Sequence, residues 1–349
     1  MELRHKLIAA GLSGLAASGA ARLFQPLTSG RGALLMFHHV RPWRGDEFAP
    51  NRLLEITPEF LETVIIETRR AGFEIIGLDE GVRRLSQPVA AGARPFAVFT
   101  FDDGYRDNAE IALPVLERHD VPFTLYVTTG FADRTARLWW RELEGALRHV
   151  TRLRCRTAQG DIDMPAATAH EKQVAFRRVY WALRAGPEAD LLETTGRLFR
   201  EAGGDSAALV EGLCLDWDGL AAISRHRLCT IGVHTLTHPR LAKLTPDEAQ
   251  REMAQARDEI TRRLQVPGAH LSYPVGDPSS AGPREFALAR ELGFSTAVTT
   301  RPGMVMAAHA GRMQALPRLS VNGLHQSRQA FGALLSGLPF ALMNRFQPA

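Results

Sequence analysis

Six short runs of apolar residues, separated from one another by helical sequence, constrain the fold of this chain more than any other feature. They are rich in strand-forming residues and show almost no alternation with polar residues. Continuous apolar runs of this length are typical of parallel strands that are buried on both faces. The runs cover residues 33–37, 96–101, 123–127, 230–233, 271–273 and 296–299. The sequence therefore predicts an α/β domain with a parallel sheet, closed or open.

Two of the intervening helices have recognisable starts. Thr57 precedes Pro58, which is the usual order of an N-cap residue and the first helical residue. Thr245 and Glu248 have the spacing of a capping box, in which each side chain bonds the backbone amide of the other residue. The helix that follows carries one apolar stripe at helical spacing, made of Met253, Ala256, Ile260 and Leu264.

One long segment departs from the alternation of strands and helices. Residues from about 133 to 216 are rich in arginine, alanine and glutamate and show helical rather than strand character, as in 171–185 and 189–202. We interpret this segment as a helical insertion in a single domain that covers residues 31–325. Residues 326–349 are predicted to form a C-terminal tail helix.

The N-terminal 30 residues have two interpretations. A basic start at Arg4 and Lys6 precedes a stretch of small residues, which resembles a weak signal peptide. Three glycines and two serines make its apolar core thin, which favours a short amphipathic helix. We therefore expect a cytoplasmic or membrane-peripheral location, with export as the alternative. No run approaches the roughly twenty apolar residues that a membrane-spanning helix needs.

Composition excludes several classes of protein. Hydrophobic residues make up 45% of the chain and charged residues 23%, which is typical of a globular enzyme and excludes a disordered chain. The net charge of +4 comes from scattered arginines, so no nucleic-acid partner is expected. Cys155, Cys214 and Cys229 form no CxxC pair, which favours free thiols over a disulfide framework. The oligomeric state is left open.

Two adjacent carboxylates, Asp102 and Asp103, follow the second apolar run and precede Gly104. Carboxylates at the C-terminal end of a parallel strand point into the crevice where such folds bind their ligands. A simple turn after the strand is the alternative interpretation of this motif.

Two histidines, His234 and His238, follow another apolar run four residues apart. Two imidazoles and one carboxylate form the three-ligand set of a catalytic zinc site, which leaves a position open for water. A neighbouring carboxylate can then accept a proton, so the two aspartates can divide metal binding and base catalysis. Two unrelated hydrogen-bonding histidines are the alternative.

The motifs at residues 100–104 (TFDDG) and 234–238 (HTLTH) resemble those of the polysaccharide deacetylase family, which includes the NodB-type chitooligosaccharide deacetylases and carbohydrate esterases. The resemblance covers roughly residues 34–321, apart from the insertion. Three further segments are similar to family motifs: residues 36–40 to Tyr-His-x-Val, 273–276 to Tyr-Pro-x-Gly and 316–320 to a closing Pro-Arg stretch.

The resemblance implies a distorted, incomplete (β/α) barrel of seven strands, with its site at the C-terminal ends of the strands. It implies one divalent metal ion, zinc by default and cobalt or nickel as alternatives. The residues carried over by position are Asp102 as general base, Asp103, His234 and His238 as metal ligands, and Tyr273, Pro274 and Gly276 at the substrate rim, together with Arg318.

The sequence departs from the family pattern at the general acid. The late Leu-x-His motif that supplies the acid in many members has no clear match, and His309 and His325 are weak candidates. His38 is the preferred acid, with a core or supporting histidine as the alternative. The family's Arg-Pro-Tyr motif, whose arginine holds the base, is also missing, and Arg318 is the hypothetical replacement.

The expected activity is the removal of N-acetyl groups from an amino-sugar oligosaccharide or polysaccharide. A related hydrolase acting on a cyclic amide, an imide or an O-acetyl ester is one alternative, and a catalytically inactive glycan-binding domain is another. Trp139 and Trp140 are expected to pack the insertion against the barrel rather than to form a platform for sugar rings.

Overall fold

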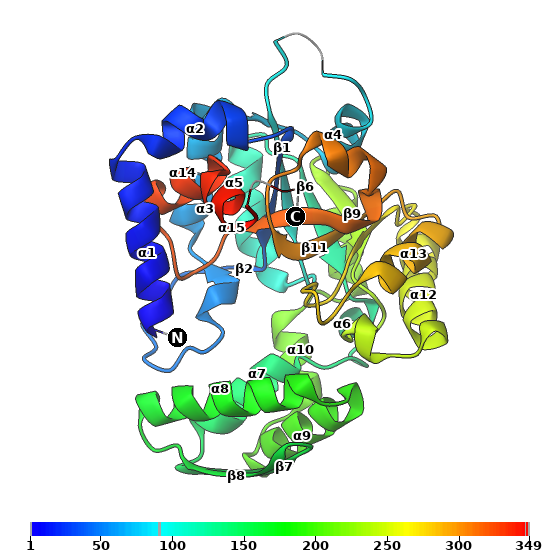
Figure 1. Cartoon of the computed structure of the whole chain (residues 1–349). Helices are drawn as coiled ribbons and strands as arrows, with labels where there is room; N and C mark the ends of the chain where they lie inside the picture. The colour runs from blue at the N-terminus through cyan, green and yellow to red at the C-terminus, as the bar shows by residue number, and fades with distance from the viewer. Residues whose placement is uncertain (1, 90–91, 346, 348–349) are drawn as a thin grey trace.

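Seven parallel strands close into a barrel at the centre of the molecule (Figure 1). The computed structural model describes residues 2–89, 92–345 and 347. Around the ring lie β1 (Gly32–Phe37), β12 (Leu316–Ser320), β11 (Thr296–Pro302), β10 (His270–Ser272), β9 (Cys229–Val233), β6 (Phe123–Val127) and β5 (Phe96–Phe101). β5 pairs again with β1 along the whole strand, which closes the ring. The predicted seven-stranded (β/α) barrel is therefore confirmed, one strand short of the usual eight.

Two strands of this sheet do not belong to the predicted apolar runs. β12 contains Pro317 and Arg318, which interrupt its apolar sequence although the strand is largely buried. β4 (Glu74–Ile75) has only two residues and pairs with the beginning of β5. Neither strand has a continuous apolar run long enough to be recognised in the sequence.

The interior of the barrel is filled by every second side chain of its strands. Leu34 of β1 and Val98 of β5 belong to one buried cluster with Tyr126, Val298 and Leu316 from three other strands. Leu78 and Leu85 of α4 (Leu78–Leu85) join this cluster, and α4 lies against the beginning of β5. Because α4 covers the N-terminal end of the barrel, only the C-terminal end is left for a site.

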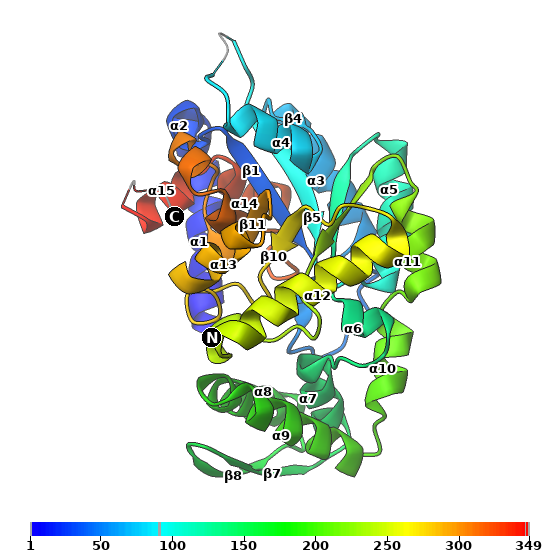
Figure 2. The same cartoon turned by 90° about the vertical axis from the view of Figure 1, so that its right-hand side faces the viewer.

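Helices cover the outside of the barrel (Figure 2). α3 (Pro58–Arg70) begins as predicted, because the Thr57 hydroxyl accepts a hydrogen bond from the amide of Phe60. α12 (Pro246–Leu264) begins with the predicted capping box between Thr245 and Glu248. The other helices around the barrel are α5 (Leu113–Arg118), α11 (Trp217–Ser224) and α13 (Pro283–Glu291).

The insertion between β6 and β9 has its own hydrophobic core. Its helices are α7 (Trp139–Arg148), α8 (Ala169–Ala185), α9 (Glu188–Glu201) and α10 (Ser206–Leu213). It also contains an antiparallel hairpin of β7 (Arg152–Thr157) and β8 (Gly160–Pro165), so the expectation of purely helical character is wrong. In β7 exposed arginines alternate with the buried residues Leu153, Cys155 and Thr157. The strand therefore contains no continuous apolar run that could be recognised in the sequence.

Each end of the chain forms two helices where one was predicted. At the N-terminus Gly19, with a φ of 73°, separates α1 (Glu2–Ala17) from α2 (Ala20–Thr28). At the C-terminus Gly337, with a φ of 76°, follows α14 (Arg328–Leu335) and precedes α15 (Leu338–Met343). Glycine adopts this left-handed conformation without steric cost, so it ends one helix and redirects the chain. None of the helices formed by the described residues combines the length and apolar composition needed to span a bilayer.

Candidate active site

Three buried side chains converge at the C-terminal end of the barrel. Asp103, His234 and His238 place one potential ligand atom each within 4.8 Å of one another. The Nε2 atoms of His234 and His238 lie 3.4 Å and 3.3 Å from the same oxygen, Oδ1 of Asp103. The structure therefore brings together the three residues that the sequence assigns to the metal.

The donor set fits a divalent cation. Oδ1 of Asp103 is buried and has no hydrogen-bond partner among the described residues. The Nδ1 atom of His234 lies 2.7 Å from the carbonyl oxygen of Ser272. A proton on Nδ1 donates to this carbonyl, which leaves the lone pair of Nε2 directed at the other ligands. Burial alone raises the pKa of a carboxyl group, but the contacts with His234 and His238 hold the pKa of Asp103 well below its usual value.

The backbone around these side chains is strained. Four non-glycine residues have positive φ angles here: Asp103 at 75°, Thr235 at 65°, His238 at 64° and Val275 at 61°. Each such residue costs roughly 1–3 kcal/mol and persists only where the surrounding structure enforces it. In the loops after β5 and β9 this geometry turns the carboxylate and both imidazoles toward one point.

Asp102 forms a buried ion pair with Arg318. The guanidinium bonds both carboxylate oxygens, with Nη1–Oδ1 at 2.8 Å and Nη2–Oδ2 at 2.6 Å. Its Nε donates to the carbonyl of Thr299, and Nη2 also donates to Ser272 Oγ. Burial disfavours the ionised carboxylate, but the charge of Arg318 and its hydrogen bonds keep the pKa of Asp102 below its usual value. Arg318 thus holds Asp102, as hypothesised, and it is fully buried rather than at the rim.

His38 is half-buried directly after β1. It continues the inward-facing series of Leu34 in β1, just as Asp102 continues that of Val98 in β5. Burial lowers the pKa of His38, although the nearby charges of Asp103 and Asp102 act in the opposite direction. His38 and Asp102 therefore follow the inward-facing rows of two paired strands at the C-terminal end of the barrel.

Sequence reasoning missed a second histidine beside the site. His39 is fully buried, its Nδ1 lies 2.7 Å from Asp107 Oδ2, and its ring stacks on Tyr105 at 3.5 Å. Burial raises the pKa of Asp107 to about 7. Only His38 of this adjacent pair was considered in the sequence analysis. Because side chains alternate along an extended chain, His39 lies on the opposite face from His38.

The predicted rim residues Tyr273, Pro274 and Gly276 lie in the loop that follows β10. The side chain of Tyr273 is fully buried, and its hydroxyl donates to the carbonyl of Gln314 at 2.9 Å. Pro274 is buried, and its carbonyl accepts from the amide of Gly276. Gly276 has a φ of 62°, and a Cβ atom there would lie 2.8 Å from the amide nitrogen of Thr300. Pro274 and Gly276 therefore shape the loop, and the Tyr273 hydroxyl anchors it to the Gln314 carbonyl.

One of the two weaker candidates for the acid lies at the other end of the barrel. His309 is buried in a short 3₁₀ helix (Ala307–Gly311) that follows Val305. Val305 bridges to Gly32 at the beginning of β1, which is the opposite end of the barrel from the metal ligands. His325 follows β12 in the segment that leads to α14. His309 is therefore excluded as the acid.

Trp140 connects the insertion to a metal ligand. Its ring centroid lies 4.8 Å from that of His238, and Phe131 lies on the same imidazole at 5.8 Å. Trp140 is 5% exposed and Trp139 3% exposed, so both rings pack the interior rather than form a platform for sugars. Nδ1 of His238 has no hydrogen-bond partner among the described residues, so aromatic packing sets the orientation of this ring.

Replacing Trp140 by leucine is expected to weaken metal affinity by about 10- to 100-fold, the usual cost of losing support for a ligand. Trp140→Phe keeps an aromatic face on His238 and should bind metal nearly as wild type does. The matched control is Trp139→Leu, because Trp139 contacts Trp140 and Tyr180 inside the insertion but has no ring contact with His238 among the described residues. Competition with a chromogenic chelator measures the affinity, and equal affinities for Trp140→Leu and Trp139→Leu would contradict this role.

Comparisons with known proteins agree with this geometry. The polysaccharide deacetylase family matches residues 91–297, more than half of the chain. The Bacillus subtilis (strain 168) protein named "Putative polysaccharide deacetylase YxkH" is 32% identical over 109 residues, which span 31% of this chain and 37% of that protein.

Two solved structures share the fold. The Streptococcus pyogenes deacetylase PplD has a TM-score of 0.55 at 17% identity, over 90% of this chain and 98% of its own. IcaB from Ammonifex degensii has a TM-score of 0.53 at 16% identity, over 86% and 96%. The match to the family over residues that include Asp102, Asp103, His234 and His238 shows that this chain belongs to the polysaccharide deacetylase family.

Proposed function

We propose that this protein is a zinc-dependent hydrolase that removes N-acetyl groups from an amino-sugar oligosaccharide or polysaccharide, of the chitooligosaccharide or poly-N-acetylglucosamine kind. The observation that carries the proposal is the pairing of two functions in adjacent residues. Asp103 joins His234 and His238, while Asp102 is held ionised by Arg318. A base next to a three-ligand cation site is the arrangement that amide hydrolysis requires.

A divalent cation held by Asp103, His234 and His238 would supply the charge that polarises an acetamide carbonyl and acidifies a water molecule. Asp102 accepts a proton from the water molecule while the oxygen of that water attacks the carbonyl carbon. Arg318 keeps this carboxylate ionised and fixes both of its oxygens in place. The bond between the carbonyl carbon and the nitrogen breaks when the nitrogen receives a proton, because an unprotonated amine is a poor leaving group. The imidazolium form of His38 gives that proton, and the proton that Asp102 took from the water restores this form as acetate and the free amino sugar leave.

Two observations support deacetylation over the opening of a cyclic amide and over glycan binding without activity. The fold neighbour PplD was solved in complex with acetate, which is the second product of deacetylation. The bidentate Asp102–Arg318 pair supplies a base that a glycan-binding domain without activity would not use. Hydrolysis of a cyclic amide, an imide or an O-acetyl ester uses the same base and cation, so only the choice of substrate separates it from deacetylation.

Metal content and acetate release on N-acetylglucosamine oligomers test the proposal, for the wild type, Asp102→Asn and His38→Ala. We expect about one equivalent of zinc in all three proteins, because none of the changes removes a ligand. Acetate release should fall by more than about a hundredfold in both variants, the usual contribution of a general acid or base. Stoichiometric metal without acetate from any acetylated glycan would overturn the assignment, and turnover of cyclic imides or xylan acetate would replace it. Wild-type rates for His38→Ala would remove His38 as the acid.

A further inference from the structure

Two helices from opposite ends of the chain expose large apolar side chains next to each other. α2 leads into β1, α15 is near the C-terminus, and the two helices pack together (Figure 2). Leu23 is 73% exposed and Leu27 76% exposed on α2. Leu342 and Met343 are more than half exposed on α15. We call the exposed parts of these two helices the α2–α15 face.

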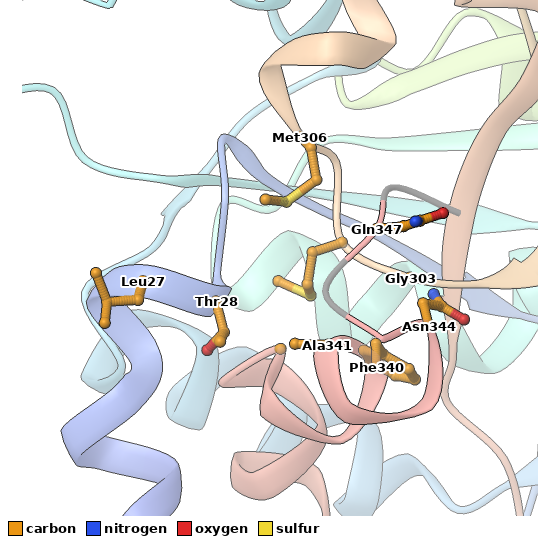
Figure 3. Close-up of a pocket in the computed structure, with 10 residues that line it drawn as sticks. Leu27, Thr28, Gly303, Met306, Phe340, Ala341, Asn344 and Gln347 are labelled. Atoms are coloured by element: carbon orange, nitrogen blue, oxygen red, sulfur yellow. The ribbon is translucent and has the colours of Figure 1, made fainter.

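The two helices are held closely enough to form one surface. The Cα of Gly337 approaches α2 so closely that a Cβ atom there would lie 2.1 Å from the carbonyl oxygen of Thr28. The Thr28 hydroxyl in turn donates to the carbonyl of Ser336 at 2.6 Å. A groove of about 100 Å³ lies between the helices, with Leu27 on one side and Phe340 and Ala341 on the other (Figure 3). The exposed side chain of Leu27 therefore borders this groove.

The charges on this face are of one sign. α2 and residues 338–345 contain no aspartate or glutamate, and the exposed residues Arg22 and Arg345 lie at the two helices. Large apolar side chains flanked by arginine are typical of helices that lie in the interface of an anionic bilayer. Two copies of the same face would bring arginines of like charge together, which disfavours a symmetric dimer through it.

The position of the face is compatible with access to a glycan. α2 ends just before Gly32, at the N-terminal end of the barrel, whereas the metal ligands follow the C-terminal ends of β5 and β9. A surface bound through α2 and α15 therefore leaves the candidate active site uncovered.

We propose that the α2–α15 face docks on the surface of an anionic phospholipid bilayer. Leu23, Leu27, Leu342 and Met343 enter the boundary between head groups and acyl chains, while Arg22 and Arg345 contact lipid phosphates. The inference goes beyond the proposed deacetylation and does not depend on it.

Co-sedimentation of the full-length protein with vesicles tests the proposal. We expect binding to vesicles of equal parts phosphatidylglycerol and phosphatidylcholine, and much weaker binding to phosphatidylcholine alone. Leu23→Ser/Leu27→Ser should weaken partitioning by about tenfold or more, since two leucines no longer leave water. Arg22→Gln/Arg345→Gln should weaken it by about fivefold per charge at low salt. The matched control is Leu53→Ser/Val89→Ser, which removes two exposed apolar side chains outside the face.

Sedimentation velocity without lipid tests the alternative occupant of the face, which is a second copy of the chain. Equal vesicle binding by Leu23→Ser/Leu27→Ser and by the control variant would overturn the proposal, as would no binding of the wild type. A dimer that Leu23→Ser/Leu27→Ser converts to a monomer, without lipid binding, would assign the face to a second copy of the chain. Acetate release by the variants of the face reports independently on the proposed activity, because α2 ends at the opposite end of the barrel from the metal ligands.

Discussion

Asp103→Asn is expected to lose bound metal and, with it, essentially all hydrolysis. The Oδ1 atom of Asp103 lies within 3.4 Å of both histidine Nε2 atoms and is the only anionic ligand of the three. An asparagine offers no charge to neutralise a dication, so we expect metal affinity to fall by more than about a hundredfold and acetate release by about a thousandfold or more. Plasma emission spectrometry after dialysis measures the metal, and the acetate assay measures the activity.

His234→Ala should give the same result, because it removes the ligand whose Nδ1 is fixed by Ser272. The matched control is His226→Ala, a histidine that bonds Glu117 on the outside of the barrel. The control should keep about one equivalent of metal and wild-type activity. Metal retained at wild-type affinity by Asp103→Asn would show that the cation binds elsewhere.

Arg318→Met is expected to lower the free energy of unfolding by roughly 3–5 kcal/mol, the usual effect of removing one partner of a buried ion pair. The methionine fills part of the volume but leaves the Asp102 carboxylate buried without its bidentate partner. Urea denaturation measures the loss. Activity should fall as well, because the orientation of Asp102 and its charged state both depend on this arginine.

Two further variants separate charge from packing. Asp102→Asn/Arg318→Met removes both charges, so its loss of stability should be smaller than the sum of the two single losses. Arg301→Met is the matched control on β11, where the guanidinium bonds the Ala281 carbonyl and lies over Phe286. It should cost only about 1 kcal/mol, since no buried carboxylate loses its partner. A loss below about 1 kcal/mol for Arg318→Met would show that Asp102 is stable without it.

The parallel strands and the candidate metal ligands were accessible to sequence reasoning because their signals are local, whereas closure into a barrel was implied only by the family resemblance. Buried parallel strands are continuous apolar runs, and β5 and β9 are each followed directly by their polar ligands. The hydroxyls of Thr57 and Thr245 cap their helices by accepting from the amide three residues later, a spacing that the sequence displays directly.

Features that depend on distant parts of the chain were missed. β7 alternates arginine with Leu153, Cys155 and Thr157, and it forms a strand because Leu153 and Cys155 pack into the core of the insertion. The side chain of Tyr273 points to α13 and the Gln314 carbonyl rather than to the site. The hairpin and the orientation of Tyr273 both depend on packing between segments that are distant in the sequence, and the sequence does not show which of these segments meet.

The sequence by itself determined the kind of site: two histidines, a carboxylate ligand and a second carboxylate, each at the end of a buried strand. The residue types and their spacing are sufficient to indicate this kind of site, because ligand and base chemistry depend on the side chains themselves. Only the tertiary structure decided which groups support the site. Arg318 reaches Asp102 across 216 residues because closure of the barrel brings β12 close to β5, and Trp140 reaches His238 because the insertion folds back over the strand ends. The contacts of Arg318 with Asp102 and of Trp140 with His238 join residues far apart in the sequence, so only the folded structure determines the distances between them.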